Sequence, residues 1–344
     1  MKNCFFFFCL AFQLLPVMGQ EVQLVGVGFY NLENLFDTTD DPNTFDDDYT
    51  PAGARHWNEA LLSQKIENLS TVISKIGQAE NLPGLDLLGI CETENAALLR
   101  RLLASEKMRP FNYGFIHFDS PDHRGIDVAL LYKHESFLPV HSTHYPLQLK
   151  SEKQFSITTR DQLVVTGYLW GEEVSVLINH WPSRRGGKKR SAPLRKAAAR
   201  LQQQIMDSLF NLNPKAKILM LGDFNDNPSD ASLLSLTKEN DYYPHFQPLY
   251  NPMQALAQKG LGSLAYRDQW FLFDQILLSP AWLKDPNFFY LQTKIFNPPW
   301  LRTPQGRYKG YPYRTNRSRD FLKGYSDHFP VYILLGLNLS STIP

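Results

Sequence analysis

Four apolar runs of strand length in this sequence end in polar side chains that can bind metals or transfer protons. Histidine can act as a general acid or base, and carboxylate and amide oxygens are the ligands that hard divalent cations prefer. Polar groups at strand ends collect on one rim of a sheet, where binding sites are commonly built. The four runs therefore predict one shared site. The residues at their ends are Asn31, Glu92, Asn179 with His180, and Asp223 with Asn225.

Short motifs surround these residues and follow one another along most of the chain. They are Tyr30–Asn34, Ile90–Glu92, Arg124–Leu130, Asn179–Trp181, Gly222–Asn225, Asp274–Leu277 and Ser326–Pro330. With this ordered set the sequence resembles the endonuclease/exonuclease/phosphatase superfamily. That superfamily includes pancreatic-type deoxyribonuclease, repair nucleases of the exonuclease-III type, sphingomyelinases and inositol-polyphosphate phosphatases. The resemblance runs from residue 25 to residue 335 and implies a phosphoester hydrolase.

A metal site is expected from the first two motifs. Phosphoester hydrolysis needs charge neutralisation on the phosphoryl oxygens, an aligned water and a proton for the leaving group. Mg²⁺ prefers oxygen ligands from one or two carboxylates together with substrate phosphate. Glu92 is the candidate carboxylate and Asn31 a neutral amide ligand, and the resemblance adds Asp327 as support for the metal or the site hydrogen bonds. We expect Mg²⁺ or Mn²⁺, with Ca²⁺ as a further candidate.

The later motifs carry the acid–base residues. Asp223 and Asn225 are two residues apart, so in an extended segment their side chains point the same way. The resemblance implies that Asp223 orients or deprotonates the attacking water, or serves the leaving group, and that Asn225 holds the phosphate. It also implies that Asp274 fixes the tautomer of His328 and supports its positive charge. His180, as in the deoxyribonuclease and sphingomyelinase types, is a general acid or phosphate ligand whose acid partner stays open.

Cations near these motifs are candidate contacts for an anionic substrate. Arg124 and Arg184 are the candidate phosphate ligands. Residues 184–200 hold eight Lys or Arg and no acid, and residues 307–319 hold five more, interleaved with tyrosines. These tracts suit an anionic partner or stacking on bases or sugars, but they also suit solvated or ordinary loop surfaces. The Asp-rich loop at residues 37–48 does not have the spacing of an EF-hand.

The charge balance leaves the substrate class open. The formal net charge is +1, which speaks against a general DNA binder, whereas the two basic tracts favour one. A small or lipid-like phosphoester is slightly preferred, and an endonuclease acting on DNA or RNA is the alternative. A non-catalytic binding module on the same fold would be expected to have lost Glu92 or His328, and both are present. No protein partner can be inferred.

Apolar periodicity predicts mixed strands and helices. The helical stripe is clearest from Leu62 to Ile76, and residues 94–106 and 193–210 are also expected to be helical, the last with Ser191 and Pro193 near its start. Strands mixed with helices indicate sheets covered by helices. The resemblance implies an α+β fold, a four-layer α/β/β/α sandwich of two packed mixed β-sheets flanked by helices. Strands are expected at residues 22–30, 85–91, 126–132, 174–178, 217–221, 271–278 and 329–335.

The first nineteen residues have the composition of a signal peptide. Lys2 precedes an apolar run with four consecutive phenylalanines, and Gly19 ends a candidate cleavage site. The run is shorter than the ~20 residues of a membrane span, so stable membrane insertion is not expected. We expect residues 1–19 to be a signal peptide and residues 20–344 a single catalytic domain, exported to the periplasm or the medium. Cleavage would leave Cys91 as the one cysteine, a buried small hydrophobe without a disulfide.

The signal-peptide interpretation predicts processing near Gly19. Mass spectrometry of the protein exported by an expressing cell should show an N-terminus close to Gln20. An exported chain that retains Cys4 would contradict it.

Overall fold

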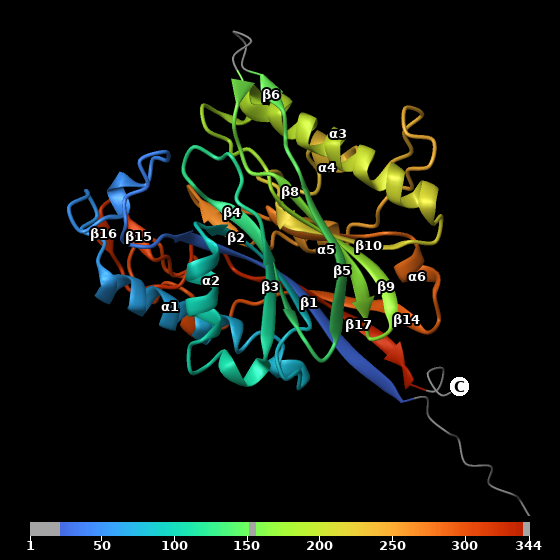
Figure 1. Cartoon of the computed structure of the whole chain (residues 1–344), viewed down its shortest axis with the longest axis horizontal. Coiled ribbons are helices and arrows are strands. Elements are labelled where there is room, and N and C mark those ends of the chain that lie inside the picture. Colours follow the sequence, from blue (N-terminus) through green and yellow to red (C-terminus); the bar gives the residue numbers. More distant parts are fainter. Residues whose placement is uncertain (1–20, 151–155, 340–344) are drawn as a thin grey trace, which may run out of the picture.

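The computed structural model describes residues 21–150 and 156–339, so the expected signal peptide lies outside the described residues. Two mixed sheets pack face to face (Figure 1). The first has the order β14-β17-β1-β2-β4-β3 and the second the order β13-β10-β9-β8-β5. The strands of the first sheet are β1 (Val22–Leu35), β2 (Leu87–Thr93), β3 (Tyr113–His117), β4 (Asp127–Lys133), β14 (Phe288–Ile295) and β17 (Val331–Asn338). Those of the second are β5 (Phe137–Tyr145), β8 (Gln162–Leu169), β9 (Glu172–His180), β10 (Lys217–Asp223) and β13 (Asp274–Leu278).

The three longer helices cover the outer faces of the sheets (Figure 1), whereas two of the short helices contribute Met253 and Trp282 to the apolar cluster between the sheets. The longer ones are α1 (Glu59–Ile73), α2 (Ala96–Leu103) and α3 (Lys188–Leu212), and the short ones are α4 (Ala231–Leu234), α5 (Met253–Gln258) and α6 (Ala281–Lys284). One apolar cluster lies between the sheets, a second joins the first sheet to α1 and α2, and a third joins the second sheet to α3. The expected α+β, four-layer sandwich of two packed mixed sheets flanked by helices is confirmed.

Local sequence explains where the helices begin. Asn58 caps α1 by accepting from the amides of Ala60 and Leu61, and Asn95 caps α2 by accepting from the amide of Leu98. The α3 helix begins at Lys188, earlier than expected, and Pro193 lies inside it. Among the described residues, no helix has the length and apolarity that crossing a membrane requires.

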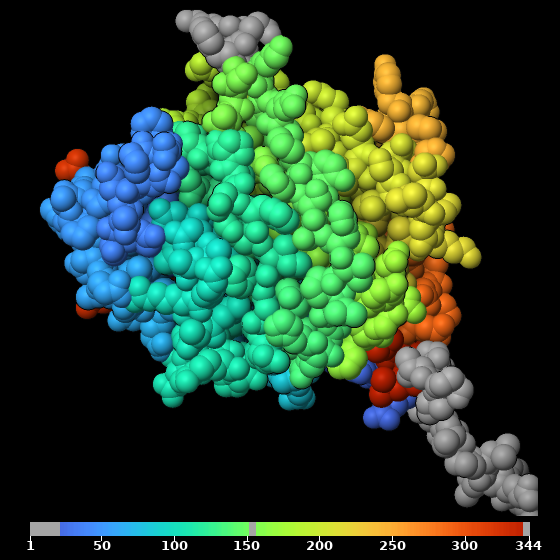
Figure 2. All heavy atoms as spheres, viewed as in Figure 1, coloured from blue at the N-terminus to red at the C-terminus, as the bar shows by residue number. Residues whose placement is uncertain are grey.

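Each sheet contains one parallel strand pair whose connection includes a helix. Strands β1 and β2 are parallel and connected through α1, and β9 and β10 are parallel and connected through α3. Parallel strands present their carboxyl ends at the same edge of a sheet, so both connections bring strand ends together. Figure 2 shows the N-terminal part of the chain in blue and teal packed directly against the green and yellow middle part.

Short elements frame the strand ends. They are the strand pairs β6 (Leu149–Lys150) with β7 (Ser156–Ile157), β11 (Leu264–Tyr266) with β12 (Gln269–Phe271), and β15 (Asn316–Arg317) with β16 (Asp320–Phe321). The strand expected at residues 271–278 is divided, because Leu272 and Phe273 separate β12 from β13. Four 3₁₀ turns complete the described structure, η1 (Asp47–Tyr49), η2 (Gln78–Glu80), η3 (Arg109–Phe111) and η4 (Pro299–Leu301).

The inter-sheet core predicts a large penalty for truncating Phe29 on β1. This side chain is fully buried between the sheets, so Phe29→Ala should lower the free energy of unfolding by about 3–5 kcal/mol. Leu138→Ala on β5 is the control, because 65% of that residue is exposed and its loss should change stability by less than about 0.5 kcal/mol. Denaturant titration of both variants checks the difference. Equal midpoints would contradict this packing.

Candidate active site

The parallel strand pairs bring the expected site residues to one rim. Asn31 on β1 lies opposite Cys91 on β2, which places Glu92 beside it. In the second sheet, Asp223 on β10 lies opposite His180 on β9 and also opposite Asp274 on β13. The register of both sheets therefore fixes which polar side chains meet.

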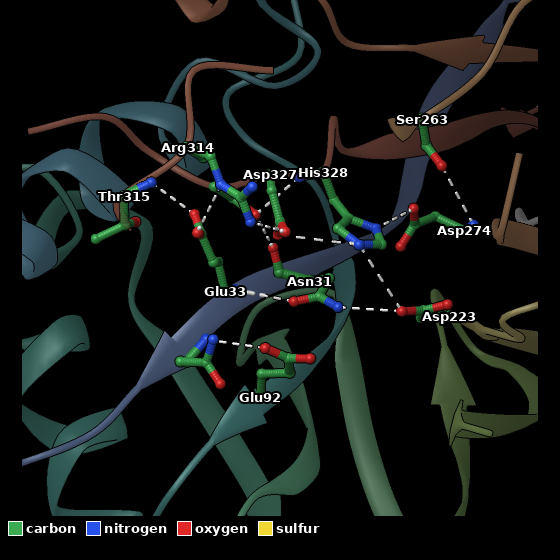
Figure 3. A network of polar contacts seen from close by, with 12 residues as sticks. Asn31, Glu33, Glu92, Asp223, Ser263, Asp274, Arg314, Thr315, Asp327 and His328 are labelled. Atoms are coloured by element: carbon green, nitrogen blue, oxygen red, sulfur yellow. Dashed lines mark hydrogen bonds and ion pairs between the residues drawn. The ribbon is translucent and has the colours of Figure 1, made fainter. Parts of the chain in front are cut away.

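One hydrogen bond joins the two halves of this site. The side-chain amide of Asn31 donates to Asp223 Oδ2 at 3.1 Å, and Asn31 Oδ1 accepts from the backbone amide of Glu33 at 2.9 Å (Figure 3). Asn31 and Asp223 are both buried. The first sheet thus holds the Asp223 carboxylate of the second in a fixed position.

His328 forms the pair with Asp274 that the sequence predicted. Its Nδ1 lies 2.6 Å from Asp274 Oδ2, and its Nε2 lies 4.0 Å from both Asp223 Oδ2 and Asp327 Oδ1 (Figure 3). Burial opposes protonation, but the Asp274 carboxylate and the neighbouring acids outweigh it and hold the pKa of His328 well above its usual value. This shift favours the protonated imidazolium of His328, whose Nε2 faces Asp223.

His180 lies in the same site with the opposite charge preference. Its Nε2 is 3.7 Å from Asp223 Oδ2 and 3.8 Å from Glu92 Oε1, whereas Nδ1 is buried with no hydrogen-bond partner in the described chain. Burial, with the nearby charges of Arg160 and Arg124, lowers the pKa of His180 well below its usual value. This shift favours the neutral imidazole of His180. No acid in residues 21–150 or 156–339 hydrogen-bonds to its Nδ1.

Asp223 sits at the centre of the site. Its Oδ1 accepts from the backbone amide of Asn225 at 2.9 Å. Burial raises the pKa of Asp223 to about 7, and His328 partly offsets this. The Asn225 side-chain amide donates to the Trp181 carbonyl at 3.0 Å, and its backbone has φ +51°. Asp223 thus has the properties of a proton acceptor near neutral pH.

The donor set suits a hard divalent cation. Glu92, with φ +63°, accepts the Asn34 amide through Oε2 at 3.0 Å, while its Oε1 faces His180. Asp327 accepts from Arg314 through Oδ2 and directs Oδ1 toward His328. Carboxylate oxygens beside an amide oxygen are ligands that Mg²⁺ accepts.

A second group of possible ligands overlaps this set. Ligand atoms of Asp223, Asp274 and His328 lie within 4.8 Å of one another. His328 Nδ1 already contacts Asp274, so this group is also explained as an acid–base pair beside a carboxylate.

The sequence analysis missed an ionic network behind Asp327, in which Glu33 and Lys65 are buried and Arg314 is exposed. Glu33 accepts from the Thr315 amide at 2.6 Å, and Arg314 bridges Glu33 and Asp327 at 3.4 and 2.8 Å (Figure 3). Lys65, fully buried, donates to Thr315 Oγ1 and to the Tyr325 carbonyl.

Burial shifts the pKa values of the two buried charged groups of this network, Glu33 and Lys65. Burial raises the pKa of Glu33 to about 7 and lowers that of Lys65 to about 8. A signal was present in the sequence, because Lys65 falls on the apolar stripe of α1 between Leu62 and Leu69. A lysine there needs a buried partner.

The two candidate phosphate ligands differ in their surroundings. Arg124 is partly exposed, with Nε 3.8 Å from Asp122. Arg184 donates to the Asn225 carbonyl and pairs with Asp226 and Asp230 at 3.1 and 2.7 Å. These contacts give Arg184 a structural explanation, since both carboxylates already neutralise it.

Two further cations in the tract at residues 184–200 are also paired internally. Lys188 pairs with Asp230 at 2.5 Å, and the fully buried Arg195 pairs with Asp226 at 2.7 Å. A cation missed by the sequence analysis, Arg160, is buried between Asp122 and the Trp181 carbonyl beside His180. The tract is therefore less cationic at its surface than its sequence suggests.

A protein-family model described as the endonuclease/exonuclease/phosphatase family matches residues 26–336. The chain belongs to the endonuclease/exonuclease/phosphatase family. Enzymes of this family are hydrolases of phosphoester bonds and are generally dependent on divalent metals. No curated protein matches the sequence significantly.

Solved structures of the family share the fold. A Bacteroides thetaiotaomicron family protein is 17% identical with TM-score 0.54, and covers 93% of this chain and 100% of its own. A mannosyl-6-phosphatase from Bacteroides thetaiotaomicron is 18% identical with TM-score 0.54, covering 90% and 99%. A humanized D. rerio TDP2 is 14% identical with TM-score 0.53, covering 91% and 98%. At these identities the similarity shows the fold alone.

The short contact between His328 and Asp274 predicts that the two act as one unit. His328→Ala and Asp274→Asn should each lower kcat on bis-p-nitrophenyl phosphate by ~10²-fold or more, and the double variant should lose little beyond that. A double-mutant cycle measures the coupling, with the exposed His141→Ala on β5 as control. Additive losses would separate the pair.

Proposed function

We propose that this chain is a divalent-metal-dependent phosphoesterase that hydrolyses a phosphodiester or phosphomonoester by attack of water. The observation that carries the proposal is the meeting of Asp223 with Asn31 of the other sheet and with the His328–Asp274 pair. Strand register positions Asp223 and Asn31, whereas the His328 imidazole, in the loop before β17, is held by Asp274. These are the groups that phosphoryl transfer to water requires.

The cation would be held by Glu92 and Asn31, with Asp327 beside them. When bound, Mg²⁺ or Mn²⁺ supplies positive charge that neutralises the phosphoryl oxygens. Arg314 and Glu33 keep the Asp327 carboxylate in place.

The site residues have different roles in the reaction. Asp223, with its pKa near neutrality, orients the water and accepts its proton as the water oxygen bonds to phosphorus. The ester P–O bond breaks, and the leaving oxygen takes a proton from the site or from solvent. The His328 imidazolium, supported by Asp274, stabilises the charge that develops on the phosphoryl group. Neutral His180, with Asn225 and Arg124, contacts the remaining phosphoryl oxygens.

Three of the eight cations at residues 184–200 are paired with acids, which leaves fewer free cations for a polymer and favours a small or lipid-like substrate. Polymeric nucleic acid is bound through many phosphates at once, which requires a row of free cations. Arg184, Lys188 and Arg195 are instead paired with acids of this chain. An endonuclease acting on DNA or RNA stays the alternative. The proposed setting is outside the cytoplasm, because residues 1–19 have signal-peptide composition.

Metal removal and Glu92→Gln test the proposal together. EDTA should abolish hydrolysis of bis-p-nitrophenyl phosphate, and Mg²⁺ or Mn²⁺ should restore it. Glu92→Gln keeps the size of the side chain but removes its charge, so kcat should fall by ~10²-fold or more and more metal should be needed. The matched control is Glu173→Gln, on an exposed part of β9 at the other end of the strand from His180. Full activity in EDTA or in Glu92→Gln would remove the metal assignment.

A further inference from the structure

A cavity of about 510 Å³ lies between the β11–β12 hairpin and the loop that follows η4. We call it the arginine–tyrosine cavity, and the residues used to define it here are Tyr266, Arg267, Arg307, Tyr308, Arg314 and Arg317. Its volume is in the range of small-molecule binding sites. The catalytic proposal makes no use of it, apart from Arg314.

The charges of this cavity favour an anion. Four arginines line it, against the single carboxylate of Asp268. Asp268 Oδ1 already accepts from the Tyr311 hydroxyl at 2.7 Å, and the Asp268 amide donates to the same hydroxyl oxygen at 2.8 Å. The side chains therefore offer guanidinium donors in excess of free carboxylate acceptors.

Aromatic faces accompany these cations. Tyr308 is 38% exposed, with Arg317 4.8 Å and Arg307 5.8 Å from its ring centroid. Tyr266 is 59% exposed with Arg267 beside its ring. Arginine next to an exposed aromatic face is an arrangement on which flat rings stack.

Two contacts connect the cavity to the reaction centre. Arg314 lines the cavity and donates to Asp327 at 2.8 Å, so one guanidinium belongs to both places (Figure 3). Trp270 packs against Tyr311 of the cavity wall and stacks on Phe329, the residue after His328. Arg314 and Trp270 therefore each contact both the cavity wall and a residue next to His328.

We infer that the arginine–tyrosine cavity binds the organic part of the substrate. This part has the size of one nucleotide. It consists of a flat ring and an anionic group that is separate from the phosphoryl group being hydrolysed. The inference rests on the proposed function and names the substrate class for it. A neutral sugar offers no negative charge to the four arginines, and Oδ1 of the one lining carboxylate, Asp268, already accepts from Tyr311. A nucleobase presents acceptor edges to arginine and a flat face to tyrosine.

Calorimetric titration of the full-length protein tests this inference with AMP and ribose 5-phosphate as probes. Binding is measured in EDTA, so that neither metal nor hydrolysis contributes. AMP should bind at least about tenfold more tightly than ribose 5-phosphate, because only AMP has a base to stack. Tyr308→Ala should weaken AMP about tenfold and leave ribose 5-phosphate unchanged, whereas Arg317→Ala should weaken both. The control Tyr242→Ala, at a residue 91% exposed elsewhere on the surface, should change neither.

Equal affinities for the two probes, or AMP binding that Tyr308→Ala leaves intact, would overturn the inference. Circular dichroism of each variant separates lost contacts from failure to fold. The proposed function is tested apart from this, by turnover of bis-p-nitrophenyl phosphate with Mn²⁺. Turnover without AMP binding would reject the cavity assignment alone, whereas AMP binding without turnover would reject the catalytic proposal.

Discussion

The register of two parallel strand pairs is the constraint on which this molecule depends. Because side chains alternate between the faces of a strand, a slip of one residue would turn every inward side chain outward. The pairing of Asn31 with Cys91 and of Asp223 with His180 therefore fixes the core and the site in one step. The Asn31–Asp223 hydrogen bond then joins the sheets where their strands end. The packing of the two sheets therefore also positions the side chains of the site.

The pKa values of two histidines in the same buried rim are shifted in opposite directions because their Nδ1 atoms have different neighbours. Asp274 contacts Nδ1 of His328, and its charge outweighs the effect of burial. No described acid contacts Nδ1 of His180, and the cations Arg160 and Arg124 add to the effect of burial. The site thus favours one cationic and one neutral imidazole. The cationic imidazole of His328 can only donate hydrogen bonds, whereas the neutral imidazole of His180 can donate from one nitrogen and accept at the other.

The sequence revealed those parts of the fold and site that are encoded locally. Apolar runs with polar ends predicted the strands that lead to Asn31, Glu92 and Asp223, and the apolar stripe predicted α1. The Glu33–Lys65–Arg314 network could not be derived in the same way, because Glu33 and Arg314 are 281 residues apart and meet only after both sheets form. The pairing of Arg184 with acids about 40 residues later was equally hidden. Edge strands such as β5, which is largely exposed, lack the buried runs that reveal a strand.

Glu92 and Asn225 both hold left-handed backbone conformations, with φ of +63° and +51°. For residues other than glycine such conformations cost of the order of 1–3 kcal/mol, with asparagine at the tolerant end. At position 92 the fold accepts this strain in a residue poorly suited to it, so that a carboxylate can face His180. Glycine there would relax the chain and remove the proposed metal ligand. A screen for thermostable variants that measured only heat resistance would therefore favour the loss of Glu92. Such a screen should also measure activity, because we propose that Glu92 binds the metal.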